Sequence, residues 1–135
     1  MKNILPILLL LALLLTGCSA SSNAAEENTY RQITMTEAIE MMEKEENYII
    51  LDVRTEQEFA AGHIPGAILV PNETIGTTDI AQLPDKDQLI MVYCRSGNRS
   101  KQASDKLVRL GYTNIVEFGG INSWPGRIVT DSSAG

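Results

Sequence analysis

Apolar runs and segments of helical periodicity alternate along this chain. The runs at 48–53 (YIILDV) and 88–94 (QLIMVYC) contain no regular polar positions, which is typical of strands covered on both faces of a sheet. Shorter runs at 67–71 (AILVP) and 114–118 (NIVEF) predict two further strands. Strands that alternate with helices indicate an α/β domain with a mainly parallel sheet, and such a sheet binds ligands at the carboxyl ends of its strands.

Helices are predicted before and between these strands, at 36–45, 55–62, 79–83 (a single turn) and 100–110. The first two begin with a capping box, formed by Thr34 with Glu37 and by Thr55 with Glu58. The second helix ends at Gly62 and Gly111 follows the last helix, and glycine is common where helices end. The last helix therefore begins a few residues after the strand that ends at Cys94.

The N-terminal segment has the pattern of an export signal. Lys2 precedes an apolar run at 4–15, which is shorter than the roughly 20 residues of a membrane-spanning helix. The residues LTGC that end at Cys18 resemble the bacterial lipobox, whose cysteine carries lipid and becomes the new N-terminus. The resemblance implies lipidation of Cys18 and a location outside the cytoplasm, on a membrane of the bacterial cell envelope. The alternatives are an ordinary signal peptide with an incidental cysteine, or an uncleaved anchor.

Length and charge limit the organisation of the chain. We expect a signal peptide over 1–17, a lipid-anchored flexible tether over 18–29, one folded domain over 30–128 and a disordered tail over 129–135.

The 135 residues carry a formal charge of −6, and an acidic chain without a basic stripe is a poor candidate for binding nucleic acid. Several of its positive charges gather after Cys94, at Arg95, Arg99, Lys101, Lys106 and Arg109.

The stretch YCRSGNRS, around Cys94, combines the features of an activated thiol. With Cys18 assigned to lipid, Cys94 has no disulfide partner in the chain. A helix N-terminus lowers a thiol pKa from about 8.5 toward ~3.5–7.5, and the N–H groups of a tight loop also favour an anion. Gly97 permits such a loop, and Arg95 and Arg99 add positive charge. This pattern predicts a nucleophile in an anion-binding cradle, with a buried inert cysteine as the alternative.

The length of the loop separates two kinds of chemistry. Four residues lie between Cys94 and Arg99, whereas phosphatases of the tyrosine-phosphatase type place five residues between cysteine and arginine. A shorter loop forms a smaller cradle, which suits one sulfur atom carried on the cysteine better than a tetrahedral phosphate. Phosphatase and arsenate-reductase activity are therefore disfavoured.

Three motifs in order resemble the signatures of single-domain rhodanese-like sulfurtransferases. They are ILDVRTEQEFAAGHIPGA (50–67), YCRSGNRS (93–100) and GYTNIVEFGGINSW (111–124). The resemblance implies the rhodanese-like α/β fold, a central, mainly parallel sheet of about five strands with helices on both faces. It also implies a monomer that needs no metal and no organic cofactor.

The resemblance implies a reaction as well. Cys94 would take a sulfane sulfur from a small anion such as thiosulfate, form a persulfide, and pass the sulfur to cyanide or a thiol. The loop would bind substrate through Arg95, Ser96, Gly97, Asn98 and Arg99. Two alternatives stay open: a persulfide carrier that serves a protein partner, and a binding or regulatory module of the same fold without turnover.

Other polar residues near these motifs are interpreted as structural. Arg54 and Glu58 are expected to pair across the first turn of a helix, beside Asp52 at the end of a strand. His63 and Trp124 belong to the scaffold in this interpretation. The segment after Trp124 is shorter than is common in the resembling family, so its path over the sheet is open.

Lipidation of Cys18 gives a first prediction. Cys18→Ala should release the protein from bacterial membranes or block its processing, because the attachment site for lipid is gone. Cell fractionation and intact-mass measurement check this, with Ser21→Ala in the same tether as the matched control. Unchanged membrane retention and processing of Cys18→Ala would refute the assignment.

Overall fold

A computed structural model describes Gly17 and residues 27–130 of the chain. The predicted signal peptide apart from Gly17, most of the predicted tether with its predicted lipidation site Cys18, and most of the predicted tail lie outside the described residues. Within the described part of the chain, none of the helices has the length and apolar character needed to cross a membrane. Val129, which the predicted boundary places in the tail, forms an antiparallel bridge with His63, so the folded domain extends at least to this residue.

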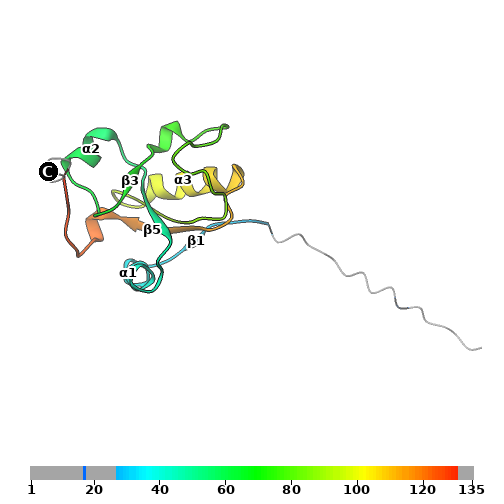
Figure 1. Ribbon diagram of the computed structural model, residues 1–135, viewed down its shortest axis with the longest axis horizontal. Coiled ribbons are helices and arrows are strands. Elements are labelled where there is room, and N and C mark those ends of the chain that lie inside the picture. Colours follow the sequence, from blue (N-terminus) through cyan, green and yellow to red (C-terminus); the bar gives the residue numbers. More distant parts are fainter. Residues whose placement is uncertain (1–16, 18–26, 131–135) are drawn as a thin grey trace, which may run out of the picture.

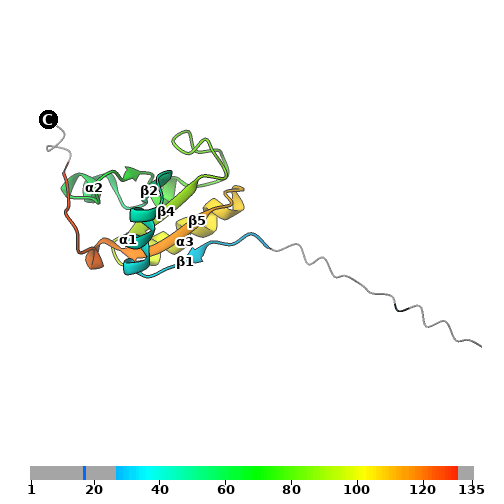
Figure 2. The same cartoon turned by 60° about the horizontal axis from the view of Figure 1, so that its bottom comes forward.

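Five parallel strands form the sheet, in the order β1-β5-β4-β2-β3. Their bounds are Arg31–Gln32 (β1), Tyr48–Asp52 (β2), Ile68–Leu69 (β3), Leu89–Cys94 (β4) and Ile115–Gly120 (β5). Helix α1 (Met35–Lys44) lies on one face and α3 (Asn98–Arg109) on the other, while α2 (Glu56–Ala61) follows the carboxyl end of β2 (Figures 1 and 2). The predicted fold class is confirmed.

Capping and strand pairing explain most element boundaries. Both predicted capping boxes are present: the side chain of Thr34 accepts the N–H of Glu37 at 3.1 Å, and that of Thr55 accepts the N–H of Glu58 at 3.2 Å. α3 begins two residues earlier than predicted. The predicted helical turn at 79–83 is only a hydrogen-bonded turn, and β1 and the 3₁₀ turn Asn72–Thr74 were not predicted. A second 3₁₀ turn, Ile121–Ser123, lies where the sequence predicts a short turn before Trp124.

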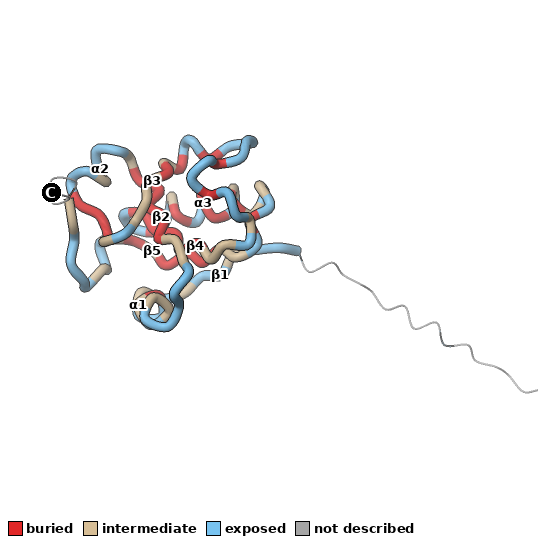
Figure 3. The backbone as a smooth tube through the Cα atoms, viewed as in Figure 1, coloured by how far each residue is buried: buried red, intermediate tan, exposed pale blue. Residues whose placement is uncertain are grey.

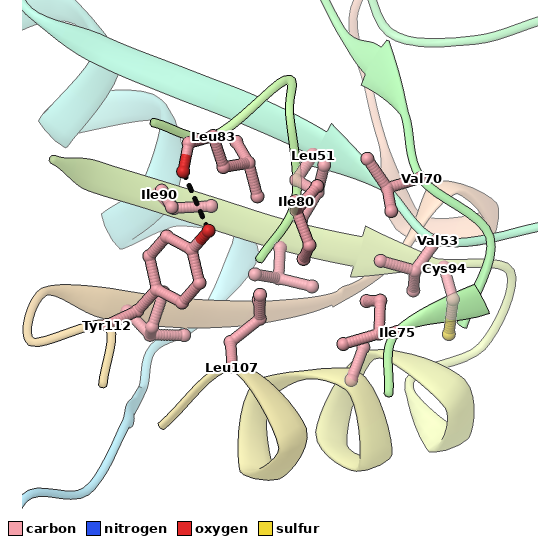
Figure 4. Packing of buried hydrophobic residues seen from close by; sticks show 13 residues of the cluster. Leu51, Val53, Val70, Ile75, Ile80, Leu83, Ile90, Cys94, Leu107 and Tyr112 are labelled. Atoms are coloured by element: carbon pink, nitrogen blue, oxygen red, sulfur yellow. Dashed lines mark hydrogen bonds between the residues drawn. The ribbon is translucent and has the colours of Figure 1, made fainter. Parts of the chain in front are cut away.

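Apolar side chains form a core on each side of the sheet. The larger core lies between the sheet and α3, and its side chains come from β2, β4, β5, α3 and the segment 70–83 (Figure 4). Tyr112 closes one end of it, where its hydroxyl donates to the carbonyl of Leu83 at 2.7 Å. The second core packs α1 against Met91, Tyr93 and Phe118. Burial on both faces explains why the central strands are apolar throughout (Figure 3).

A buried polar network joins the ends of β2 and β4. The guanidinium of Arg54 donates to both carboxylate oxygens of Asp52 and to the carbonyl of Gly62, and the hydroxyl of Tyr93 donates to Asp52 at 2.6 Å. The same hydroxyl accepts the N–H of Ile64 at 3.1 Å. Burial, and then the bond to Asp52, raise the pKa of Tyr93, so the phenol stays protonated. The predicted Arg54–Glu58 pair is wrong, because Asp52 is the partner of Arg54.

The network predicts that Tyr93→Phe destabilises the domain by about 1–3 kcal/mol, because a buried carboxylate and the N–H of Ile64 both lose a partner. Urea denaturation measures this loss. Tyr30→Phe is the matched control, since its hydroxyl contacts only the exposed side chain of Gln32 among the bonds of the described chain, and it should change stability by less than about 0.5 kcal/mol. Equal effects of the two variants would contradict the prediction.

Candidate active site

Cys94 is the last residue of β4, and its side chain is buried beneath the loop that leads into α3. Figure 4 shows its sulfur at the carboxyl end of the apolar core, beyond Val53. The pairing of β4 with β5 shifts register between Val92 and Cys94, which sets Cys94 opposite Gly120. Only three residues separate the cysteine from the first residue of α3, so the helix N-terminus lies directly beside the sulfur.

The loop curls because two glycines allow it. Gly97 has φ of 108°, in the left-handed region that favours glycine, and its N–H donates to Cys94 Sγ at 3.0 Å. At Gly120, a side chain would overlap the carbonyl of Arg95, whose oxygen also accepts the N–H of Asn122. The loop therefore rests on the end of β5, with its backbone folded over the sulfur.

Opposing effects act on the thiol of Cys94. Burial raises its pKa, but hydrogen bonding with the side chain of Ser100 and with the backbone N–H groups of Ser100, Gly97 and Ser96 outweighs burial, so the net pKa is lowered. Hydrogen bonds to the charged form stabilise a thiolate. The loop thus has the arrangement of an activated nucleophile.

The geometry of this loop agrees with a comparison of the whole sequence with known protein families. The rhodanese-like domain family matches residues 34–126. The chain belongs to this family.

The relatives of this rhodanese-like domain include sulfurtransferases. The thiosulfate sulfurtransferase PspE of Escherichia coli is 34% identical over 71 residues, which cover 53% of this chain and 68% of that protein. The thiosulfate sulfurtransferase GlpE of Pseudomonas putida is 31% identical over 107 residues, covering 78% of this chain and 94% of that protein. A rhodanese-related protein from Thermoplasma volcanium superposes with a TM-score of 0.62 at 30% identity, covering 74% of this chain and 98% of that one. A sulfurtransferase family role follows from these relatives.

In this rhodanese-like domain, Arg99 is bound to a carboxylate at the edge of the site. Its guanidinium contacts Glu58 through two bonds, Nη1 to Oε1 at 2.6 Å and Nη2 to Oε2 at 2.9 Å. The bond to Arg99 is the largest cause that lowers the pKa of Glu58, to about 2. The pair ties the start of α3 to α2 and neutralises one of the two predicted cradle arginines, whereas Arg95 is exposed. The bond of Glu58 to Arg99, 41 residues away, replaces the predicted bond to Arg54.

Two residues beneath the sulfur, Ser100 and Glu117, were not predicted to be part of the site. The hydroxyl of Ser100 lies 3.4 Å from Cys94 Sγ and 2.6 Å from Oε1 of Glu117. Glu117 also accepts the N–H of Gly119 at 2.9 Å. An acidic residue inside the apolar run 114–118 was the available signal for Glu117, and no local signal marked Ser100.

His63 and Trp124 have contacts that suit a scaffold. The ring of His63 stacks on Phe59 at 3.7 Å between centroids, and its Nδ1 lies 2.9 Å from the carbonyl of Phe59. The indole N–H of Trp124 donates to the carbonyl of Arg127, and its ring packs against the core beside α1. The segment after Trp124 runs to His63, which pairs with Val129. This contact gives the path of the short C-terminal segment, which the sequence left open.

The Glu58–Arg99 pair predicts a pH-dependent stability. Because folding lowers the pKa of Glu58, its stabilising effect is present above the unfolded value of about 4.3 and is lost as pH falls toward the folded value of about 2. Glu58→Gln should therefore reduce stability at pH 7 by about 0.5–1 kcal/mol, with a difference that disappears near pH 2.

Urea denaturation at several pH values measures the effect of Glu58→Gln. Glu56→Gln, at an exposed position of the same helix, is the matched control and should show no such trend. A stability difference between Glu58→Gln and the wild type that stays constant down to pH 2 would contradict the assigned pair.

Proposed function

We propose that this protein is a sulfurtransferase that moves a sulfane sulfur from a thiosulfate-like anion to a thiophilic acceptor through a persulfide on Cys94. The observation that carries the proposal is the sulfur at the end of β4, with the N–H of Gly97 3.0 Å away and a lowered thiol pKa. The names of the PspE and GlpE relatives support thiosulfate as the donor.

The first half of the reaction is a displacement at sulfur. The thiolate of Cys94 attacks the outer sulfur of thiosulfate and forms a new S–S bond. The S–S bond of thiosulfate breaks, and sulfite leaves with the bonding electron pair. The terminal sulfur of the persulfide then carries the negative charge, and the N–H groups of Ser96, Gly97 and Ser100 stabilise it as they stabilise the thiolate.

The second half returns the enzyme to its starting state. An acceptor nucleophile, the carbon of cyanide or the sulfur of a thiolate, attacks the terminal sulfur of the persulfide. The S–S bond to Cys94 breaks, and its electron pair restores the thiolate. Because every step exchanges one anion for another, the reaction needs no metal and no redox cofactor.

Charge around the loop favours a small anionic donor. Glu58 neutralises Arg99, so the attraction for the donor comes from the exposed Arg95 and from the N–H groups of the loop. The proposal extends to location: lipid on Cys18 would hold the domain outside the cytoplasm, where the donor and acceptor must then be found.

Intact-mass analysis tests the proposed chemistry. Protein mixed with thiosulfate should gain the mass of one sulfur atom and lose it when cyanide is added. Cys94→Ser should gain none, while Cys18→Ser, which retains the loop, should gain sulfur as the wild type does. Circular dichroism confirms that each variant is folded. Failure of the wild type to take sulfur from thiosulfate and from small persulfides would overturn the proposal.

A further inference from the structure

A buried carboxylate lies beneath the active-site loop. Glu117 in β5 is 3% exposed, and it alternates along the strand with Val116 and Phe118, so it shares the α3 face of the sheet with Ile115. Ile115 belongs to the apolar core on that face. None of the three ion pairs in the described part of the chain includes Glu117. An unpaired carboxylate at a core position costs free energy, which calls for a chemical reason.

A chain of hydrogen bonds connects this carboxylate to the reactive sulfur. The thiol of Cys94 donates to Ser100 Oγ at 3.4 Å, and Ser100 Oγ donates to Oε1 of Glu117 at 2.6 Å. Ser100 has one hydroxyl hydrogen, and the carbonyls of Gly97 at 2.9 Å and Gly119 at 3.4 Å are its other acceptors. The bond to the carboxylate is the shortest, as charge-assisted bonds are. The donors therefore point in one direction, from sulfur through oxygen to Glu117.

Other charged groups on the surrounding elements are directed elsewhere. On β1, Arg31 pairs with Val116, whose side chain lies on the opposite face from Glu117. On α3, Arg99 binds Glu58 and Lys106 binds Asn72. The remaining charged residues of the loop, α3 and α1 are at exposed positions: Arg95, Lys101, Asp105, Arg109, Glu37, Glu40, Glu43 and Lys44. Cys94 is thus the titratable group connected to Glu117.

We propose that Cys94 and Glu117 share one proton through the hydroxyl of Ser100. When the thiolate forms, the S–H bond of Cys94 breaks and its proton passes to Ser100 Oγ. The hydroxyl proton of Ser100 passes at the same time to Oε1 of Glu117. One S–H bond is exchanged for one carboxyl O–H bond, and the site keeps a single negative charge. Glu117 is a positioning residue, because it acts on the sulfur only through Ser100.

The shared proton would serve the proposed sulfur transfer. This role rests on the proposed function, whereas the sharing of the proton itself does not. Two adjacent buried negative charges are strongly unfavourable. A neutral Glu117 beneath the thiolate leaves the cradle with one negative charge when an anionic donor approaches. Two groups that interact in this way titrate as a pair, in two steps that belong to neither residue alone.

The pH dependence of Cys94 alkylation tests the pair and needs no sulfur donor. Iodoacetamide reacts with the thiolate, and peptide mass spectrometry counts Cys94 separately from Cys18. The wild-type rate should rise with pH in two steps. Glu117→Gln keeps the shape of the side chain but cannot take the proton, so its rate should rise in one step, with more thiolate at intermediate pH. A purely structural role would scale the rate equally at all pH values.

A second measurement uses the wild-type sequence and so does not depend on the folding of a variant. The carboxyl carbon of Glu117 is followed by NMR during a pH titration, before and after Cys94 is blocked with iodoacetamide. Sharing of the proton predicts that blocking moves this titration to lower pH. Ser100→Ala should weaken the shift. Ser104→Ala, another buried serine of α3, which donates only to the carbonyl of Ser100, should preserve it.

Either a change in the shape of the alkylation profile or a displaced carboxyl titration supports the shared proton. The inference is wrong if Glu117→Gln leaves the shape of the alkylation profile unchanged and blocking of Cys94 leaves the carboxyl titration unchanged. Both readings are independent of persulfide formation, so a protein that takes up no sulfur but shows the coupling would overturn the proposed function alone.

Discussion

The active-site loop can close over its sulfur only because β5 ends in a residue without a side chain. A Cβ at Gly120 would overlap the carbonyl of Arg95, and the shifted register between β4 and β5 sets Cys94 opposite this glycine. The backbone of the loop therefore packs on backbone rather than on side chains. From this contact follow the turn at Gly97, the N–H directed at the sulfur and the start of α3 beside it.

The dipoles of the Ser100 hydroxyl and of the loop N–H groups, rather than side-chain charges, lower the pKa of Cys94 in this site. Arg99, which the sequence suggested as part of the cradle, is held by Glu58, and the pair fixes α3 to α2. The bonds that lower the pKa of Cys94 against the effect of burial come from Ser100, Gly97 and Ser96. In the proposed reaction the negative charge moves from thiolate to persulfide, and dipoles fixed by the fold need no rearrangement for that step.

Elements that depend on local sequence patterns were predicted correctly, whereas features that depend on contacts between distant residues were not. Capping boxes and apolar runs gave α1, α2 and the central strands, and they placed Cys94 at a strand end. β1 has two residues and exists through its pairing with β5, so no periodicity revealed it. Arg54 and Glu58 stand at helical spacing but bind Asp52 and Arg99, because the fold brings better partners to both. Such exchanges depend on tertiary contacts that spacing does not encode.

Packing alone does not account for the carboxylate of Glu117. Without it, the hydroxyl of Ser100 would still have the carbonyl of Gly97 at 2.9 Å as an acceptor, and an apolar side chain would continue the core formed by Ile115 and Leu107, so that only the bond from the N–H of Gly119 would be lost. A buried carboxylate with no cation bound to it is expensive, so a replacement by a well-packed apolar residue should favour the fold. An apolar residue, however, could not accept a proton from the sulfur of Cys94 through the two hydrogen bonds of this network. The cost to the fold and the direction of the donors therefore point to the same explanation, that Glu117 serves the chemistry of Cys94.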